Sequence, residues 1–345
     1  MCFWAWLVGL VSGVTPMILC AKIDSSLNRR RSTIDSTANQ LERSHGMSQA
    51  SQAGTCRAFV IHNPISGRRG GRLRKVLSHL EEMGCRFVVH HTSHRGHAQE
   101  LASQVSESEY DRIVVSGGDG TINEVLNGLS LQSPPVAIIP RGTANVLAAE
   151  IGLGLNAGEI ARTIVGGEAR LVSIGAINGH KFLLMAGVGF DAQVVSAVSS
   201  TLKRSIGKGA YVLASLKQMI RGDFPRFKVL VDGAPYDAAS VVIANAHYYG
   251  GKFVCAPEAR LDRPDLQVCL FGHGSRFYVA VYGLALTLGL LPKAPGYRIL
   301  TATRIEILEP DGAEFQCDGD FIGHTPAVAT VAPQAARLVF PRQSR

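Results

Sequence analysis

The loop Gly117-Gly118-Asp119-Gly120-Thr121 follows an apolar run, Ile113–Val115, and opens a helical pattern. Glycines at such a turn, here called the glycine loop, let the backbone approach a ligand closely. The start of a helix also offers free N–H groups and a positive dipole end to a phosphate. Asp119 is unusual there, because a carboxylate repels phosphates unless a divalent cation lies between them. The loop therefore predicts a phosphate site that works with Mg²⁺, and it is no Walker loop because no Gly-Lys-Ser/Thr follows.

Residues 57–151 alternate between short apolar runs and helical patterns. The expected strands are Arg57–Ile61, Arg86–His90, Arg112–Val115 and Val136–Ile139. The helices expected after them are Leu73–Met83, Ala98–Val105, Asn123–Leu129 and Ala144–Ile151. Four consecutive β-α units predict a parallel sheet that is covered by helices on both faces.

The pattern changes after about residue 166, where strands follow one another through tight turns. Leu171–Ile177 and Lys181–Ala186 flank Asn178-Gly179, which favours a hairpin with a type I′ turn, and Asp232-Gly233 after Phe227–Val231 favours another. The remaining elements expected are helices at Gly209–Ile220 and Phe277–Leu290 and strands at Ser240–Ala244, Leu266–Phe271, Arg304–Leu308, Ala327–Val331 and Arg337–Phe340. The expected fold class is thus α/β plus β, with a parallel α/β domain over 56–166 and an antiparallel β-sandwich domain over 167–335. The strand 336–343 is able to join the first domain.

The N-terminal part of the chain differs from the rest in composition. Residues 1–21 are apolar and uncharged, and residues 22–54 are rich in Ser, Thr, Gln and Arg, a composition typical of disorder. We expect residues 1–55 to be dispensable for folding and activity, with translation starting at either Met1 or Met47. If residues 1–21 are retained, they are just long enough to anchor the chain in a membrane, with the basic residues after them on the cytoplasmic side.

The formal net charge of +8 favours an anionic partner, such as a nucleotide or an anionic membrane surface. Nucleic acid is not expected, because the chain has no zinc-finger spacing, no RNA-binding aromatic signature and no long basic arm. The seven cysteines are widely spaced and odd in number, which favours a reducing cytoplasm over a disulfide framework.

Two further loops follow strands of the predicted parallel sheet. Asn63-Pro64-Ile65-Ser66-Gly67 comes after the first strand, and Pro140-Arg141-Gly142-Thr143-Ala144-Asn145 comes after the fourth. Each alone could be an ordinary β-α turn. Because loops at the same edge of a parallel sheet face one crevice, these two and the glycine loop together predict one nucleotide site.

A pair of carboxylates comes late in the chain, in Cys317-Asp318-Gly319-Asp320. Two carboxylates around a glycine can hold a metal ion and take a proton from a hydroxyl group. Asp-Gly-Asp is also a common turn, so the motif gains its weight from the other signals in the chain.

The glycine loop and its extension, Asn123-Glu124-Val125-x-Asn127-Gly128, resemble the catalytic-domain motif of diacylglycerol kinases, sphingosine kinases and related bacterial lipid kinases. The resemblance runs from about Phe59 to Phe340. Its other matching positions are Asn63-Pro64, Ser66-Gly67, Thr92, Gly96-His97-Ala98, Gly142–Asn145, Gly187–Ala192, Asn245, Gly250-Gly251 and Asp318-Gly319-Asp320. The resemblance implies a phosphofructokinase-like nucleotide domain, a β-sandwich lipid domain and an active site between them.

Position by position, the resemblance implies three acidic site residues. Asp318 matches the general base, and Asp119 matches the aspartate that organises Mg²⁺. Asp320 matches a glutamate of the metal network, and its side chain is one methylene shorter than that glutamate. The candidate metal ligands are therefore Asp119 and Asp320. The candidate nucleotide-binding residues, from the loops and the resemblance together, are Asn63, Ser66, Gly67, Thr92, Gly117, Gly118, Gly120, Thr121, Glu124, Gly142, Thr143 and Asn145.

The function implied is a kinase that uses ATP and Mg²⁺ to phosphorylate a hydroxyl group of a lipid, such as diacylglycerol or a sphingoid base. An NAD kinase shares the glycine loop, but the extension at 123–128 and the late Asp-Gly-Asp favour the lipid kinase. A lipid-binding relative without activity is the third reading, and intact Asp119 and Asp318 argue against it. The expected location is cytoplasmic, at the inner face of an anionic membrane. A homodimer stays open.

Overall fold

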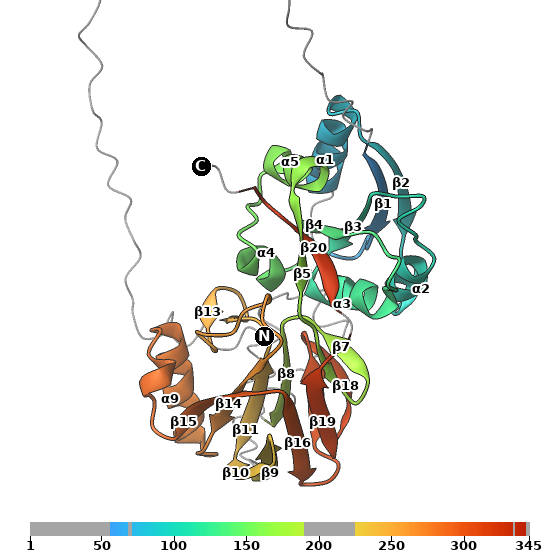
Figure 1. The fold of residues 1–345 in the computed structure, drawn as a ribbon. Helices are drawn as coiled ribbons and strands as arrows, with labels where there is room; N and C mark the ends of the chain where they lie inside the picture. The colour runs from blue at the N-terminus through green and yellow to red at the C-terminus, as the bar shows by residue number, and fades with distance from the viewer. Residues whose placement is uncertain (1–55, 68–70, 190–224, 334, 343–345) are drawn as a thin grey trace, which may run out of the picture. The chain divides into compact units, whose positions relative to one another are not determined.

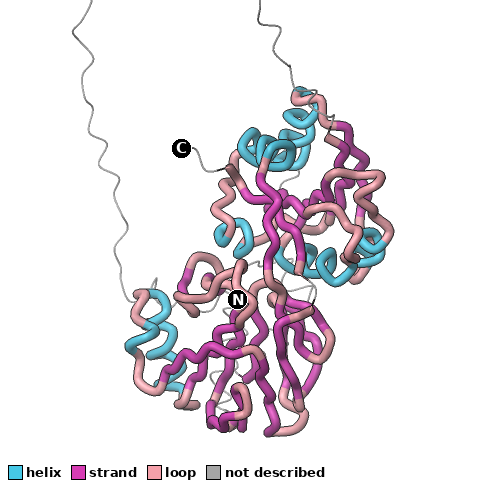
Figure 2. The backbone as a smooth tube through the Cα atoms, viewed as in Figure 1, coloured by secondary structure: helices cyan, strands magenta, loops and turns pink. Residues whose placement is uncertain are grey.

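The computed structural model describes residues 56–67, 71–189, 225–333 and 335–342. Its first half alternates strands and helices as expected, and it adds one helix, α5 (Ala157–Gly166), that was not predicted from the sequence (Figures 1 and 2). The elements are β1 (Arg57–His62), α1 (Gly71–Glu82), β2 (Arg86–His91), α2 (His97–Ser103), β3 (Arg112–Gly117), α3 (Asp119–Gly128), β4 (Val136–Pro140), α4 (Val146–Glu150) and α5 (Ala157–Gly166). The expected leader over residues 1–55 and the expected helix Gly209–Ile220 lie outside the described residues.

The first sheet has the strand order β2-β1-β3-β4-β20-β5. Neighbouring strands from β2 to β20 (Ala336–Phe340) are parallel, and β5 (Glu168–Val172) runs antiparallel to β20. The C-terminal strand therefore lies within the first sheet, between β4 and β5. Buried residues fill β1 and β4 almost without alternation, as expected for strands covered on both faces.

One sequence expectation about this sheet is wrong. Leu171 was expected to begin a hairpin of the second half, but β5 pairs with β20 in the first sheet. The hairpin begins later, at β6 (Gly175–Ile177), and returns through β7 (His180–Phe182). An edge strand with only one buried residue carries little periodicity, so the sequence pattern does not separate β5 from β6.

The second half forms two antiparallel six-stranded sheets, with orders β10-β9-β16-β19-β6-β7 and β15-β14-β11-β8-β17-β18. Both expected type I′ turns are confirmed by positive φ at Asn178-Gly179 and Asp232-Gly233. The remaining elements are β8 (Met185–Gly189), β9 (Phe227–Val231), β10 (Ala234–Ala238), β11 (Ser240–Ala244), β12 (Tyr248–Tyr249), β13 (Phe253–Val254), β14 (Leu266–Phe271), α9 (Arg276–Thr287), η1 (Leu291–Lys293), β15 (Tyr297–Ala302), β16 (Arg304–Glu309), β17 (Glu314–Cys317), β18 (Asp320–His324) and β19 (Ala327–Val331). Among the described helices, none is long and apolar enough to cross a membrane.

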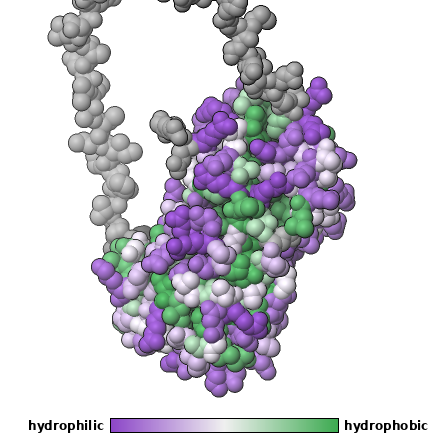
Figure 3. Space-filling view, in the orientation of Figure 1, coloured by the Kyte–Doolittle hydropathy of each residue, from purple (hydrophilic) through white to green (hydrophobic). Residues whose placement is uncertain are grey.

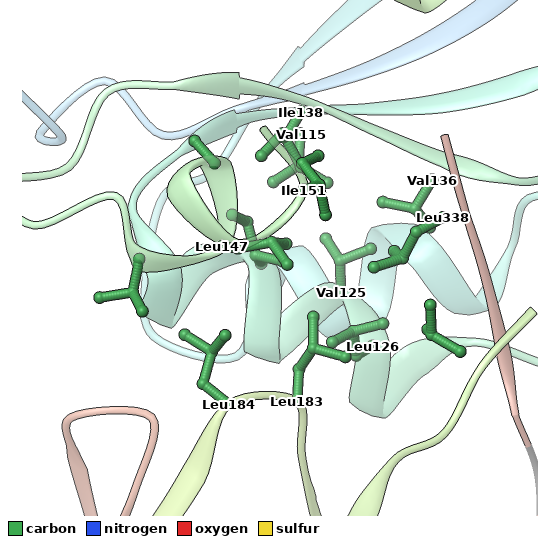
Figure 4. Packing of buried hydrophobic residues seen from close by; sticks show 14 of the residues in the cluster. Val115, Val125, Leu126, Val136, Ile138, Leu147, Ile151, Leu183, Leu184 and Leu338 are labelled. Carbon is green, nitrogen blue, oxygen red and sulfur yellow. The ribbon is translucent and has the colours of Figure 1, made fainter. Parts of the chain in front are cut away.

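Two clusters of buried side chains hold these layers together. One fills the space between the two antiparallel sheets, with Phe182 and Phe227 among its largest members. The other covers the parallel sheet and also takes in Leu183 and Leu184, which follow β7. Figure 4 shows these two leucines pointing toward α3, so the second half contributes directly to the core of the first. Hydrophilic residues cover much of the face seen in Figure 3, with hydrophobic areas between them.

The position of β20 predicts that Leu338 is important for the stability of the parallel sheet. Leu338 is 1% exposed, so Leu338→Ala should lower the free energy of unfolding by about 2 to 5 kcal/mol through lost burial and a cavity. Leu171→Ala on the neighbouring β5 is the control, because Leu171 is 67% exposed and should lose less than about 0.5 kcal/mol. Urea denaturation of both variants measures this, and equal losses would contradict the placement of β20.

Candidate active site

The three loops at the carboxyl ends of β1, β3 and β4 are brought together in the structure. The Asn63 side-chain amide donates a hydrogen bond of 2.9 Å to Thr121 Oγ1, which joins the first loop to the glycine loop. A methyl group at Gly142 would lie 2.8 Å from the Cα atom of Gly118, closer than side-chain carbons come to a backbone atom, so a glycine at 142 lets these two loops touch. The loops that follow β1, β3 and β4 therefore lie together at one edge of the sheet.

Asp119 is the first residue of α3, and its carboxylate links the glycine loop to α4. Its two oxygens accept hydrogen bonds of 3.2 Å from the backbone N–H groups of Val146 and Leu147. Beside it, Asn145 Oδ1 is buried and has no hydrogen-bond donor among the described residues. A buried acceptor without a donor is costly, so this oxygen is suited to receive a donor from a ligand or from metal-bound water.

The late Asp-Gly-Asp motif forms a tight hairpin turn between β17 and β18. Cys317 pairs with Asp320 across the two strands, and Asp318 and Gly319 have φ values of 47° and 88° between them. Positive φ at both central residues is the type I′ geometry, which Asp-Gly favours. Asp318 therefore lies in the turn itself, whereas Asp320 begins the returning strand β18.

Asp318 is buried, with 4% of its surface exposed. Its carboxylate accepts four hydrogen bonds of 2.8 to 2.9 Å. The donors are the backbone N–H groups of Leu183, Leu184 and Met185 and the side-chain amide of Asn123 on α3. Burial raises the pKa of Asp318 to about 6, against the opposing effect of these hydrogen bonds. All four hydrogen bonds hold this carboxylate inside the protein.

Asp320 has the opposite surroundings. It is only half-buried, and a methyl group at Gly120 would lie 3.0 Å from its Oδ2 atom. The carboxylate therefore lies against the glycine loop, although it comes from the second half of the chain. Its charge also reaches His180, whose pKa is lowered by burial and partly restored by Asp320.

Within the described residues, no group of three or more His, Cys, Asp or Glu side chains could hold a metal ion by itself. Mg²⁺ is commonly bound through one or two carboxylates together with substrate phosphates, so such a group is not required. The carboxylate of Asp320 beside Gly120, and the orphaned oxygen of Asn145, are oxygen donors of the kind that Mg²⁺ and its waters take. The donor set fits the ion.

Two family models match the chain, one for each half. Residues 57–177 match the diacylglycerol kinase catalytic domain, and residues 185–340 match the YegS C-terminal NAD kinase beta sandwich-like domain. The chain belongs to the diacylglycerol kinase family of lipid kinases. The parallel α/β half followed by the antiparallel β half agrees with the fold that the resemblance implied.

Similar proteins cover more than four fifths of this lipid kinase. A diacylglycerol kinase of Bacillus subtilis is 28% identical over 83% of this chain and 97% of its own length. A probable lipid kinase, YegS-like, of Pseudomonas aeruginosa is 29% identical over 83% of this chain and 94% of its own. The crystal structure of a putative diacylglycerol kinase from Bacillus anthracis superposes with a TM-score of 0.71, at 25% identity, over 82% of this chain and 96% of that one.

Other predicted nucleotide residues of this lipid kinase lie at the same sheet edge. Ser66 and Gly67 follow β1, Thr92 follows β2 with its N–H bound to the His62 carbonyl, and Thr143 is exposed in the loop after β4. Glu124 differs, because its carboxylate accepts a hydrogen bond of 3.3 Å from the N–H of Ala98 at the start of α2. The structure thus gives Glu124 a contact that joins α2 to α3.

Sequence reasoning missed the part played by Asn123 and Asn127. Asn123 donates to Asp318 and to the Lys181 carbonyl, and Asn127 donates to the Lys181 carbonyl and accepts from its N–H. Both asparagines therefore fasten α3 to β7, and Asn123 also fastens α3 to the turn at 317–320. The signal was present in the extension of the glycine loop, where two asparagines four residues apart lie on one face of a helix.

Arg141, in the loop after β4, extends its side chain into the protein. It is 6% exposed, and its Nη1 atom lies 3.2 Å from Nε2 of His62. Burial and the charge of Arg141 lower the pKa of His62, so the ring stays neutral beside the guanidinium. The side chain of Arg141 therefore anchors the loop after β4 to an uncharged histidine in the interior.

The surroundings of Asp318 predict that its carboxylate contributes to the stability of the fold. Asp318→Asn places an NH₂ group against two N–H donors in either amide orientation, so the free energy of unfolding should fall by about 2 kcal/mol or more. Asp311→Asn is the control, because Asp311 is exposed in the same half. Thermal and urea unfolding measure the difference. Equal stability of the two variants would show that the four hydrogen bonds contribute little.

The contact between His62 and Arg141 predicts a loss of stability in acid. Because the folded pKa of His62 is below its ordinary value of 6.5, the unfolded chain binds the proton first as the pH falls. The free energy of unfolding should therefore decrease below about pH 6.5. His62→Gln, which keeps an acceptor for Arg141 and does not titrate, should reduce that decrease, whereas exposed His324→Gln should not. Parallel slopes for all three proteins would contradict this assignment.

Proposed function

We propose that this lipid kinase transfers the γ-phosphoryl group of ATP, with Mg²⁺, to a hydroxyl group of a lipid such as diacylglycerol or a sphingoid base. The observation that supports this best is the carboxylate of Asp320, which comes from the second half of the chain and lies against Gly120 of the glycine loop. A phosphate site and a carboxylate that meet in this way are the minimal parts for phosphoryl transfer to an alcohol.

The nucleotide side of the proposal rests on the three loops. Their backbone N–H groups and the start of α3 are suited to hold phosphates. The hydrogen bond from Asn63 to Thr121 joins the loop after β1 to the glycine loop. Mg²⁺, when bound, supplies positive charge that neutralises the phosphate oxygens. Asp119 holds α4 against the glycine loop, so we assign it to the binding of the metal-nucleotide complex.

For the proton, the geometry favours Asp320 over Asp318 as the base. The lipid oxygen bonds to the γ-phosphorus while the bond from that phosphorus to the bridging oxygen of ADP breaks, and the hydroxyl proton passes to a carboxylate. Asp318 would first have to give up its hydrogen bonds and leave the interior. Asp320 is half-buried and already beside the glycine loop. We therefore assign Asp318 to positioning and Asp320 to the proton transfer.

The substrate also suggests where the protein works. A lipid alcohol resides in a bilayer, so we propose peripheral contact with an anionic membrane surface on the cytoplasmic side, consistent with the net charge of +8. Diacylglycerol is the first substrate to test, because it appears in the names of the B. subtilis and B. anthracis relatives.

Asp320→Asn should lower the turnover number by about a hundredfold or more, since a positioned base contributes roughly 10² to 10⁴. Asp320→Glu keeps the carboxylate and should retain most of the activity. Asp311→Asn, which changes an exposed carboxylate in the same half, should leave turnover unchanged. The measurement is transfer of radiolabelled phosphate from ATP to diacylglycerol in detergent micelles, with and without Mg²⁺.

The same assay tests the reaction itself. Phosphorylation of NAD instead of diacylglycerol would replace the lipid kinase with an NAD kinase, and lipid binding without ADP release would indicate a relative without activity. Near-normal turnover of Asp320→Asn in a folded protein would show that Asp320 is not the base. A panel of diacylglycerol, monoacylglycerol, sphingoid base, ceramide and polyprenol then identifies the acceptor.

A further inference from the structure

Helix α9 carries a stripe of exposed apolar side chains. Phe277 is 70% exposed, Leu284 is 47% exposed and Leu288, just after the helix, is 57% exposed. These positions are separated by seven and four residues, which brings them onto one face of a helix. Leu290, 45% exposed, follows directly. Single exposed apolar residues are ordinary on a protein surface, but four of them gathered on α9 and the three residues that follow it mark an interaction site.

The opposite face of α9 is fixed to the protein. Val279, Tyr282 and Leu286 are buried, and the Tyr282 hydroxyl donates a hydrogen bond of 2.9 Å to the Pro295 carbonyl. The ring of Tyr282 also packs edge-on against Phe271 of β14, with 5.1 Å between ring centroids. Since this face is held in place, the stripe cannot turn inward, and α9 presents apolar residues to the outside on a rigid support.

The charge around α9 selects the kind of partner. From Leu266 to Ile305 the chain contains no Asp or Glu, and its charged residues are Arg276, Lys293, Arg298 and Arg304. Arg276, Lys293 and Arg298 are exposed. Apolar side chains and cations in a stretch of sequence that has no acidic residues match the surface of an anionic bilayer, where each cation contributes about 1 kcal/mol near the headgroups.

We propose that α9 and the residues that follow it, up to Leu290, lie on the surface of an anionic bilayer and insert their apolar stripe among the lipids. The proposal deepens the lipid kinase function and rests on it, because a kinase whose acceptor lies in the bilayer needs a surface that holds it there. The helix has 12 residues, which suits a helix that lies in the interface and is too short for one that spans the membrane.

The test uses the full chain with vesicles of phosphatidylglycerol and phosphatidylcholine in equal parts, and with phosphatidylcholine alone. Phe277→Ser/Leu288→Ser should weaken sedimentation with the anionic vesicles by about tenfold or more. Leu131→Ser/Leu171→Ser removes two apolar side chains that are 85% and 67% exposed on the first half, and it should bind like the wild type. Binding of the wild type should weaken with added salt.

A local measurement completes the test, because all these proteins share the apolar residues 1–21. Hydrogen exchange of peptides from 276–290 should slow when anionic vesicles are added to the wild type, and unchanged exchange would overturn the proposal. A variant at Phe277 and Leu288 that binds vesicles normally but changes oligomeric state would assign the stripe to a second copy of the chain. Phosphorylation of diacylglycerol in detergent micelles separates membrane binding from catalysis, because it needs no bilayer. If neither the wild type nor the variants phosphorylate diacylglycerol in micelles, the proposed function is wrong, whatever the result of the vesicle experiment.

Discussion

The candidate site depends on the hydrogen bonds that the buried carboxylate of Asp318 accepts. A charge removed from water is costly unless donors surround it, and here all four donors belong to parts of the chain that must already be folded. Three of them are consecutive backbone N–H groups of the second half, and the fourth is the Asn123 side chain on α3. The full set of hydrogen bonds to Asp318 is therefore complete only when α3 is in its place.

The segment that binds Asp318 has a second task. The N–H groups of Leu183 and Leu184 point to the carboxylate, while their side chains belong to the apolar cluster of the parallel sheet, toward α3 (Figure 4). A polar contact and an apolar contact are thus made by the same two residues. Displacement of this segment would leave a buried charge unpaired and open a cavity together, so the two halves resist separation at this point more than burial alone would provide.

The elements of the fold that could be predicted from the sequence are those whose signal lies in neighbouring residues. The β-α units around the glycine loop and the Asn178-Gly179 and Asp232-Gly233 turns were predicted correctly, because strand periodicity and turn chemistry are read from neighbouring residues. β5 was misassigned because its partner, β20, comes more than 160 residues later.

The acidic residues of the site show the same limit. Asp318 and Asp320 look equivalent in a motif, and only the register of β17 with β18 and the position of α3 show that one is enclosed and the other lies at the glycine loop. The hydrogen bonds to Asp318 fix the position of the turn, and Asp320 follows two residues later. Asp318 therefore contributes to the site by setting the position of Asp320. An aspartate has one rotatable bond fewer than the glutamate usual in the family, so its carboxylate can adjust less. The shorter side chain makes the reach of Asp320 depend more closely on the backbone, and the enclosed Asp318 is the group that holds that backbone.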